Sequence, residues 1–285
     1  MGPVAGLLPC GTRLHLQHGP IDLVIGADGD RATAFGAATQ RFETILQELS
    51  TELTLLRRPL MQQSVRPNGS VASRMDDATR PYCPLFITRM AAVAGAVADT
   101  ILGAMRAATP LRRAYVNNGG DIALYLSEGQ RFTSEMADYT GAPLGRIEIS
   151  QADHIGGMAT SGRHGRSLSF GVADSVTVLA ATAADADAAA TMIANAIDLP
   201  NHPAISRVPA CDVSPDSDLG TAKVVTGCGA LSVPDIEMAL NGGALRANQL
   251  LRTEQIIGAG LFLQGQTRLI GTTDFTFHNR IERHA

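Results

Sequence analysis

The segment Asn117-Asn118-Gly119-Gly120-Asp121 places two amides, two glycines and a carboxylate between two apolar runs. Asn-Gly is the commonest signal for a two-residue hairpin turn, because both residues tolerate positive φ. Consecutive glycines also leave backbone N–H groups uncovered, so a ligand phosphate can approach them closely. A neighbouring aspartate can hydrogen-bond a hydroxyl group or help to hold a metal ion. The residues therefore predict a tight turn, and they leave open whether the same turn holds a ligand.

A second stretch, Gly156–Gly171, contains five glycines, four hydroxyl residues and one histidine within sixteen positions. It has neither a GxGxxG nor a Walker A pattern, so it is not a standard nucleotide loop. One interpretation is a glycine-rich surface loop. The other is a site whose hydroxyl and amide groups line an anion or a flavin, with His164 and Arg166 near the phosphates.

Three further motifs give weaker indications. Asp174 precedes the strand-like run SVTVLA, where an aspartate caps a turn or, less often, holds a metal ion. Asp185 and Asp187 open the helical segment that follows, where acidic residues favour the helix dipole. The segment 226–229 (TGCG) matches only half of a dinucleotide fingerprint, and no GxSxG motif indicates a serine nucleophile.

Strands and helices must position these residues. The runs 12–18 and 21–27 predict an opening hairpin, and apolar residues at three- and four-residue steps from Phe35 to Leu56 predict a long amphipathic helix. Residues 57–84 hold four prolines and little periodicity, which predicts a long loop or a lid. The small apolar segment 90–107 predicts a helix buried between layers, with Gly95 allowing close backbone approach.

The rest of the chain continues this mixture. Strands are expected at 113–117, 122–126, 145–150 and 175–180, helices at 183–196 and 233–254 with a break at Gly242-Gly243, and a closing hairpin at 261–271. Strict βαβ alternation is missing, which favours the α+β class with a mixed or antiparallel sheet and helices on one face. Two runs of helix, strand and strand suggest an internal pseudo-duplication within a single domain, 1–285.

Composition argues against several classes of function. The hydrophobic fraction of 45% is ordinary for a soluble globular protein, and the net charge of −4 predicts no nucleic-acid or anionic-membrane partner. No apolar run approaches the ~18–20 residues that a membrane span needs, and the N-terminus makes a poor signal peptide. The four cysteines form no CxxC pair and no zinc-like spacing. We therefore expect a cytoplasmic protein with reduced thiols.

The order of the motifs resembles that of the ApbE-like superfamily, the FAD:protein FMN transferases. In those proteins a helix reading roughly IAKGYAVD precedes a strand and loop LVNLGG followed by N/D and I. Then come ATSG, a strand SVTV and a helix beginning ADALAT. The counterparts here are 93–99, 115–122, 159–162, 175–178 and 186–191, so the resemblance covers roughly residues 80 to 200. The longer segments FITRMAAVAGAVAD, YVNNGGDIALYL, GRSLSFGVADSV and PDSDLGTAKVVTG look like an uncharacterised side branch of the superfamily.

This resemblance implies a T-fold-like α+β architecture and a pocket of flavin or nucleotide size. FAD or FMN is the implied ligand and magnesium the implied metal, and the glycines of the pocket are expected to offer backbone N–H donors. The implied contacts with the ligand are made by Asn117, Asn118, Gly119, Gly120, Asp121, Ala159, Thr160, Ser161 and Gly162.

The chain departs from the family pattern at two points. The lysine of the IAKG turn is replaced by Ala94, and the HxxDPxTG segment, whose Asp and Thr help to hold magnesium in the family, has no counterpart in 163–174. Asp174 is the best remaining metal candidate, and His164 is a candidate to substitute in space. Because phosphoryl-type transfer relies on a metal to neutralise developing charge, loss of its ligands costs on the order of three decades in rate or more.

Three hypotheses follow from these residues. The first is an ApbE-like protein that keeps a flavin- or nucleotide-sized pocket, with its transferase chemistry altered or absent. The second is a non-enzymatic binding or assembly protein on the same scaffold. The third is an active magnesium-dependent flavin transferase with relocated metal ligands. A small-molecule ligand is expected, whereas the sequence names no substrate, protein partner or oligomeric state.

Overall fold

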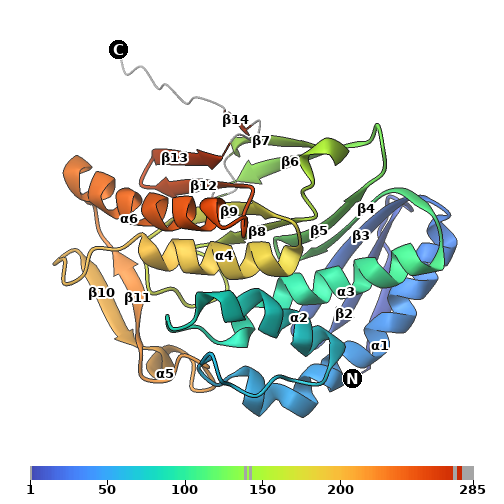
Figure 1. Cartoon of the computed structure of the whole chain (residues 1–285), viewed down its shortest axis with the longest axis horizontal. Coiled ribbons are helices and arrows are strands. Elements are labelled where there is room, and N and C mark those ends of the chain that lie inside the picture. Colours follow the sequence, from blue (N-terminus) through green and yellow to red (C-terminus); the bar gives the residue numbers. More distant parts are fainter. Residues whose placement is uncertain (1, 138–139, 141–142, 272–274, 278–285) are drawn as a thin grey trace.

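The computed structural model describes residues 2–137, 140, 143–271 and 275–277. Its centre is a nine-stranded sheet in which neighbouring strands are antiparallel (Figure 1). The opening and closing hairpins expected from the sequence form its two outer parts. The strand order is β1 (Val4–Leu7), β2 (Arg13–His18), β3 (Ile21–Gly29), β4 (Leu111–Asn118), β5 (Asp121–Leu126), β8 (Gly157–Ser161), β9 (Ser175–Ala180), β12 (Gly258–Leu263) and β13 (Gln266–Gly271).

Four long helices cover one face of this sheet (Figure 1). Alternate strand residues point toward them, so that Leu23 and Ile25 of β3 and Val116 of β4 are fully buried. The α+β class with helices packed on one face, expected from the sequence, is confirmed. Neighbouring helices pack together in the order α1 (Arg31–Leu56), α3 (Val93–Ala108), α4 (Ala183–Ala196) and α6 (Val233–Arg252).

The order of elements repeats along the chain. In the first half, the hairpin β2–β3 is followed by α1, α3 and the hairpin β4–β5. In the second half, β8–β9 is followed by α4, α6 and β12–β13. The halves join where β5 pairs with β8, through Ile122 with Met158 and Ala123 with Gly157. The topology thus shows the internal repeat that the sequence suggests.

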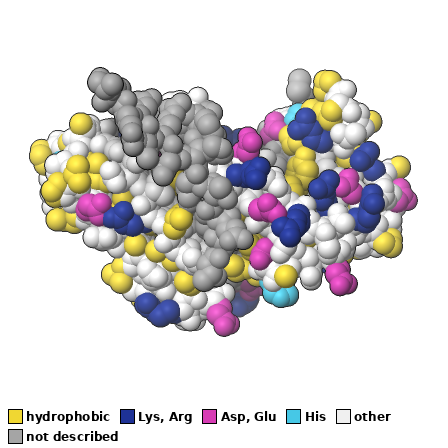
Figure 2. Space-filling view, turned by 90° about the horizontal axis from the view of Figure 1, so that it is seen from above, with side chains coloured by type: hydrophobic (Ala, Val, Ile, Leu, Met, Phe, Trp, Pro, Cys, Tyr) yellow, Lys and Arg dark blue, Asp and Glu magenta, His cyan; other side chains and the backbone are white. Residues whose placement is uncertain are grey.

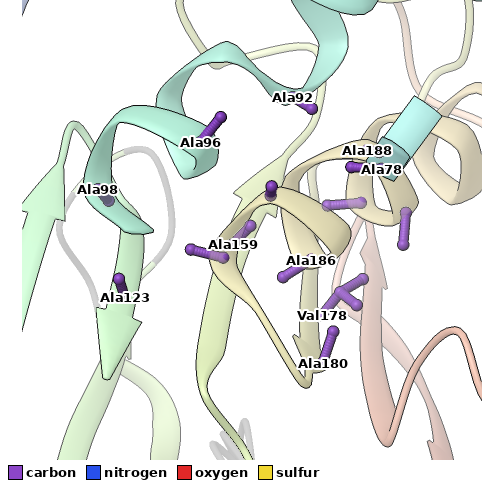
Figure 3. Close-up of a cluster of buried hydrophobic side chains, with 14 of the residues drawn as sticks. Ala78, Ala92, Ala96, Ala98, Ala123, Ala159, Val178, Ala180, Ala186 and Ala188 are labelled. Atoms are coloured by element: carbon purple, nitrogen blue, oxygen red, sulfur yellow. The ribbon is translucent and has the colours of Figure 1, made fainter. Parts of the chain in front are cut away.

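Small side chains fill the layer between the central strands and the helices α3 and α4. Figure 3 shows Ala96 of α3, Ala186 and Ala188 of α4, and Ala159 of β8 within this layer. Since each alanine side chain is a single methyl group, the helices can lie close to the sheet and to each other. The first turns of α3 and α4 are thereby brought near the ends of β4 and β8.

The opposite face of the sheet is covered in part by a small three-stranded sheet. It consists of β6 (Arg131–Ala137), β7 (Pro143–Ser150) and β14 (Phe275–Phe277), of which β6 and β14 were not expected from the sequence. A second core forms beneath it, where Ile147 and Ile149 of β7 pack against the central strands. At its margin the ring of Phe132 lies 5.7 Å from that of Tyr115 in β4.

Residues 57–84 do not form one long loop, as expected, but contain a helix. The helix α2 (Ser70–Thr79) continues into a 3-10 turn, η1 (Arg80–Tyr82). Asp76, fully buried, accepts hydrogen bonds from the guanidinium groups of Arg80 at 2.8 Å and Arg89 at 2.6 Å. Prolines on both sides of this short helix obscured its pattern of buried residues, Val71, Ala72, Met75 and Ala78. Of the residues 57–84, only Arg57 lines the cleft described below, and a lid over the cleft stays a prediction.

The segment Arg89–Ala108, formed by η2 (Arg89–Ala92) and α3, is long and apolar enough to cross a membrane by length and composition. The expectation that no run approaches this length was therefore wrong. The segment packs against α1, α4 and the sheet, and the side chain of Arg89 is fully buried in its ion pair with Asp76. These contacts are those of a core helix, as its small apolar residues predict. The cytoplasmic location stays a prediction.

Helices α3 and α4 cap each other's first turns. The carboxylate of Asp99 in α3 accepts hydrogen bonds from the N–H groups of Ala183 at 3.1 Å and Ala184 at 2.9 Å. In return, the carboxylate of Asp187 in α4 accepts one from the N–H of Gly95 at 3.1 Å. A Cβ on Gly95 would lie 2.2 Å from the carbonyl oxygen of Ala183, so only glycine fits there. The caps satisfy N–H groups that a helix leaves without partners.

Two further expectations were wrong. The stretch from Gly156 is not loop throughout, because residues 157–161 form strand β8. Helix α6 runs without a break through Gly242-Gly243, where a Cβ on Gly243 would lie 2.3 Å from the side chain of Ile197. These glycines serve close packing rather than a bend. The remaining elements are η3 (Gln151–Asp153), β10 (Ile205–Pro209), α5 (Ala210–Val213) and β11 (Lys223–Cys228).

Candidate functional site

The NNGGD segment forms the tight turn between β4 and β5. Asn118 and Asp121 are the last pair of the ladder, and Gly119 and Gly120 between them have φ values of 67° and 111°. The N–H of Gly120 donates to the side-chain oxygen of Asn117 at 2.9 Å. This N–H is therefore satisfied within the turn and is not the open donor that the sequence suggests. The turn interpretation is confirmed.

Two side chains of this turn point toward the helices. Asn118 is buried and donates a hydrogen bond to the carbonyl oxygen of Ala94 at 3.1 Å, which fixes the turn to the start of α3. Asp121 accepts a hydrogen bond from the N–H of Thr160 at 3.3 Å, which links the turn to the end of β8. The turn and the segment 159–162 are thus neighbours, as the sequence motifs implied.

The four predicted contact residues of the segment 159–162 differ in their exposure to the cleft. Ala159 is fully buried in the core and does not line the cleft, so its predicted ligand contact is wrong. Thr160, Ser161 and Gly162 do line the cleft. Gly162 has a φ of 151°, and a Cβ there would lie 2.6 Å from the carbonyl oxygen of Asp174. A residue with a side chain would push apart the two ends of the loop 162–174.

The cleft has two lobes. The first, about 650 Å³, has an apolar wall on α1 that includes Leu46, Leu49 and Leu53. The second, about 490 Å³, lies beside Phe86 and Phe170. Between them lies a set of polar residues that line both lobes, here called the waist: Asp121, Arg166, Ser167, Asp187 and Thr191.

The cleft continues toward a third hollow on the outer side of the turn. This hollow has a volume of about 380 Å³ and is lined by Asn117 and Gly120, together with Gly119 and residues 160–162. The turn therefore separates two cavities. Of its five predicted contact residues, Asn118, Gly119 and Asp121 line the first lobe, whereas Asn117 and Gly120 face the outer hollow.

Two carboxylates meet at the waist. Burial raises the pKa of Asp121 to about 7, although the Thr160 N–H and the charge of Arg166 act in the opposite direction. Burial also raises the pKa of Asp187 well above its ordinary value, and the negative charge of Asp121 raises it further. Such a pair can share a proton or hold a cation, because two neighbouring like charges that are partly removed from water are unfavourable without a counter-charge.

Asp187 was missed as a site residue by sequence reasoning, which assigned it only to the dipole of its own helix. Its carboxylate instead contacts the first turn of α3 and faces the waist. A signal was present: Asp187 and Thr191 lie four residues apart, so they share one face of α4. That face could be assigned to the cleft only once the neighbouring helix and turn were placed.

Arg166 supplies the positive charge of the waist. A Cβ on Gly119 would lie 1.9 Å from its Nη2 atom, so its guanidinium rests directly on the glycine of the turn. His164, two residues earlier, lines the first lobe, and its Nε2 lies 3.5 Å from Oδ1 of Asp174. The sequence placed both side chains near a bound anion, and the structure places both at the cleft.

Asp174, the metal candidate from the sequence, has protein donors on both oxygens. Its Oδ1 accepts hydrogen bonds from Nε of Arg163 at 3.0 Å and from Nη2 at 2.6 Å. Its Oδ2 accepts one from the N–H of Gln264 at 2.5 Å. These bonds close the loop 163–174 against β12. A metal role for Asp174 stays a prediction, and the waist offers the carboxylates with fewer protein donors.

Within the described residues, no group of three or more His, Cys, Asp or Glu side chains could hold a metal ion. A cation at the waist would therefore have two carboxylates, Asp121 and Asp187, supplemented by the hydroxyl of Thr191, by ligand oxygens and by water. Oxygen ligands of this kind suit magnesium, which usually keeps several waters and binds one or two carboxylates plus phosphate. The donor set therefore fits a hard cation that shares its ligand sphere with a phosphate.

Comparison with known proteins identifies the family of the chain. The sequence model of the family described as AbpE bacteria matches residues 5–269. A UPF0280 protein of Methanopyrus kandleri is 40% identical over 126 residues, which are 44% of this chain and 48% of that relative. A UPF0280 protein of Methanosphaerula palustris is 35% identical over 170 residues, 56% of this chain and 68% of the relative. The chain thus spans about half to two thirds of the length of these relatives.

Two solved structures are similar over nearly the whole chain. The flavin transferase ApbE from Vibrio cholerae has a TM-score of 0.44 and 12% identity, covering 95% of this chain and 96% of that one. The Pseudomonas stutzeri flavinyl transferase ApbE in its apo form has a TM-score of 0.40 and 10% identity, covering 95% and 93%.

Proposed function

The chain belongs to the family described as AbpE bacteria, and on that premise we propose that its cleft binds a flavin or related nucleotide together with a divalent cation. The observation that carries this proposal is the meeting of Asp121 and Asp187 at the waist. Each carboxylate comes from a different half of the chain, and burial raises the pKa of both. A cation between them would remove the repulsion that otherwise opposes their ionisation.

A cation would account for two half-buried carboxylates beside an arginine. A divalent ion would be held by Asp121 and Asp187, with Thr191 on the same face of α4. Its chemistry there would be to neutralise charge on a phosphate group of the ligand. Arg166, which lines both lobes, would bind the phosphate from the other side with its guanidinium group.

The lobes fit the rest of such a ligand. Volumes of about 650 Å³ and 490 Å³ lie within the range of roughly 300–1,000 Å³ typical of small-molecule sites. The leucines of α1 offer an apolar wall for a planar ring system, and Phe86 and Phe170 offer an aromatic edge in the second lobe. A ligand with two ring systems joined by phosphate would place its charge at the waist.

Isothermal titration calorimetry with FAD, in the presence and absence of magnesium, tests the proposal. We expect magnesium to strengthen binding, and Asp121→Asn or Asp187→Asn to remove that dependence on magnesium. Loss of one charged metal ligand is expected to weaken binding by roughly tenfold or more.

The matched control is Glu128→Gln, which removes one exposed carboxylate in the turn after β5. It should bind as the unaltered protein does. If FAD and FMN fail to bind at millimolar concentration with magnesium present, or if both Asn variants bind like the control, the proposed site is wrong.

A second candidate function, flavin transfer, is favoured by one observation. His164 lines the cleft and lies 3.5 Å from Asp174, the arrangement in which a carboxylate orients a histidine to accept a proton. The chain has no HxxDPxTG segment, so His164 would take this role from a shorter loop. In the absence of turnover, the same cleft would serve binding alone.

Turnover separates the two functions. If the protein transfers a flavin group, incubation with FAD and magnesium should release AMP, and His164→Gln should slow this release by about a hundredfold or more while FAD affinity stays near its original value. Release of AMP at equal rates from both proteins would exclude His164 as the proton acceptor. Binding of FAD without any release would favour the non-enzymatic function.

A further inference from the structure

A second cavity lies on the face of the central sheet that the helices do not cover. Its volume is about 540 Å³, and its walls come from β2, β3 and β4 on one side and from β6 on the other. We call it the basic pocket and define it by Arg13, Asp28, Arg31, Arg113, Tyr115, Arg131 and Phe132. Figure 2 looks toward this face, and in its right-hand part Lys and Arg side chains lie among Asp and Glu side chains around a hollow.

The period of the strands places these residues on the same side. Leu14, Ile25 and Ala114 point toward the helices and are buried, so the neighbouring residues Arg13, Gly26 and Arg113 point outward. Registers confirm their proximity, because Arg13 pairs with Gly26 and Gly26 pairs with Tyr115. Arg13 of β2 and Arg113 of β4 therefore lie on the same face of the sheet, with β3 between them.

The absence of a side chain at Gly26 leaves room for the ring of Tyr115 at the base of the pocket. A Cβ on Gly26 would lie 2.4 Å from the ring of Tyr115, so this ring occupies the space of the missing side chain. On its other side, Tyr115 contacts Phe132 of β6, with ring centroids 5.7 Å apart. The aromatic pair forms a fixed floor, and the four guanidinium groups stand around it.

The charge of the pocket is opposite in sign to that of the whole chain. The pocket is lined by four guanidinium groups and one carboxylate, Asp28, whereas the chain carries a net charge of −4. Asp28 binds Arg113 at 2.6 Å and lies 3.8 Å from Arg31. Arg131 pairs with Glu148 on β7. Two carboxylates thus form the ion pairs of three arginines. Arg13 has no carboxylate partner within the described residues.

The guanidinium of Arg13 contacts a sulfur atom in place of a carboxylate. Its Nε donates a hydrogen bond to the sulfur of Cys10 at 3.4 Å. This contact, together with a hydrogen bond from Thr12, lowers the pKa of the Cys10 thiol to about 6. An anion at the pocket would be stabilised by the same guanidinium and by Arg113, whose Nη1 is directed toward the carbonyl oxygen of Arg131 at 3.4 Å.

We propose that the basic pocket binds the phosphate groups of a small phosphorylated molecule, independently of the cleft on the other face of the sheet. Guanidinium groups suit this role because their planar N–H donors match phosphate oxygens two at a time. An anion would also balance the excess of positive charge that remains, since among the described residues only Asp28 and Glu148 pair with the four arginines. The ligand is either free pyrophosphate or the diphosphate part of a nucleotide.

Calorimetric titration with sodium pyrophosphate, without magnesium and at low salt, tests the proposal. We expect saturable binding that weakens as sodium chloride is raised, since exposed charges are screened. Arg13→Gln and Arg113→Gln should each lower the affinity by roughly tenfold, because each removes a charged hydrogen-bond donor. The thermal unfolding of each variant, measured alongside, shows that it is folded.

Two control variants locate the binding. Arg252→Gln removes an exposed arginine in the last turn of α6 and should leave the affinity unchanged. Arg166→Gln removes the guanidinium proposed to bind phosphate in the cleft, so the pyrophosphate binding that remains in this variant, and that Arg13→Gln weakens, is binding at the basic pocket. Absence of binding to the unaltered protein, an equal loss in Arg252→Gln, or a loss in Arg166→Gln alone would overturn the proposal.

A parallel titration with a nucleoside diphosphate separates the two ligand sources. Affinity equal to that of pyrophosphate indicates that the pocket recognises the diphosphate alone. Tighter binding that Arg13→Gln also weakens indicates a nucleotide. Both outcomes support the pocket, and they are independent of FAD binding at the waist.

Discussion

Asp121, Asp187 and Asp174 show how differently three aspartates behave within one region. Asp174 has an arginine and a backbone N–H on its oxygens. Asp121 has one long hydrogen bond from Thr160, at 3.3 Å, and the charge of an exposed arginine nearby. Burial therefore dominates at Asp121, and its pKa of about 7 lies where ordinary changes of pH alter its charge.

This pKa makes cation binding dependent on pH. Because the bound form needs an ionised Asp121, the affinity for magnesium should rise as pH increases toward about 7, by up to about tenfold per pH unit for this group. Calorimetry between pH 5.5 and 8.5 in buffers of different ionisation enthalpy measures both the affinity and the protons released. In Asp121→Asn the slope should be reduced.

The raised pKa of Asp121 also affects the stability of the magnesium-free protein. A carboxyl group whose pKa is raised in the folded state stabilises the fold below its unfolded value of about 3.8. That contribution is lost as pH rises toward about 7. An affinity for magnesium that stays constant across this window would show that Asp121 is not a ligand.

At the scale of elements, the mutual capping of α3 and α4 positions the site. Asp187 both accepts the N–H of Gly95 and faces the waist, so the contact between two helices also sets the place of a candidate metal ligand. Gly95 allows that contact, because no side chain fits between it and Ala183. The glycine is therefore as important for the geometry of the site as the residues that line it.

Replacement of this glycine tests the role of the helix contact. Gly95→Ala should lower the free energy of unfolding by about 1–3 kcal/mol, because the new Cβ overlaps a backbone carbonyl. The matched control is Gly103→Ala in the same helix, where a Cβ meets nothing within 4 Å. It should be neutral or stabilise by up to ~1 kcal/mol, through helix propensity. Urea unfolding of both variants gives the comparison, and equal stabilities would contradict a tight contact at Gly95.

For the molecule as a whole, local patterns predicted most elements of the fold. The apolar stripe of α1 and the glycine turns of the hairpins depend on residues close together in sequence, so they could be read directly. The helix α2 was hidden by flanking prolines, and β8 by the glycines around it. Their stability comes from burial against distant segments, which no local pattern contains.

In the candidate site too, the residues defined by a local pattern could be predicted and those brought together by distant segments could not. The turn 117–121 and the hydroxyls 160–161 could be assigned from their types and order. Asp187 could not, because its role depends on α3 and β5, which are about ninety and sixty residues away in sequence. The four arginines of the basic pocket also come from separate elements, three strands and the start of α1, so their proximity depends on the tertiary fold.

The repeated topology has a consequence for how such a site could arise. Asp121 belongs to the first of the two similar halves and Asp187 to the second, and the central strands of the halves share only a short ladder. Neither half contains both carboxylates, so a single ancestral copy could have formed this waist only by pairing with another. A ligand bound between the two aspartates would link the two halves of the chain. Its removal should first weaken the pairing of β5 with β8.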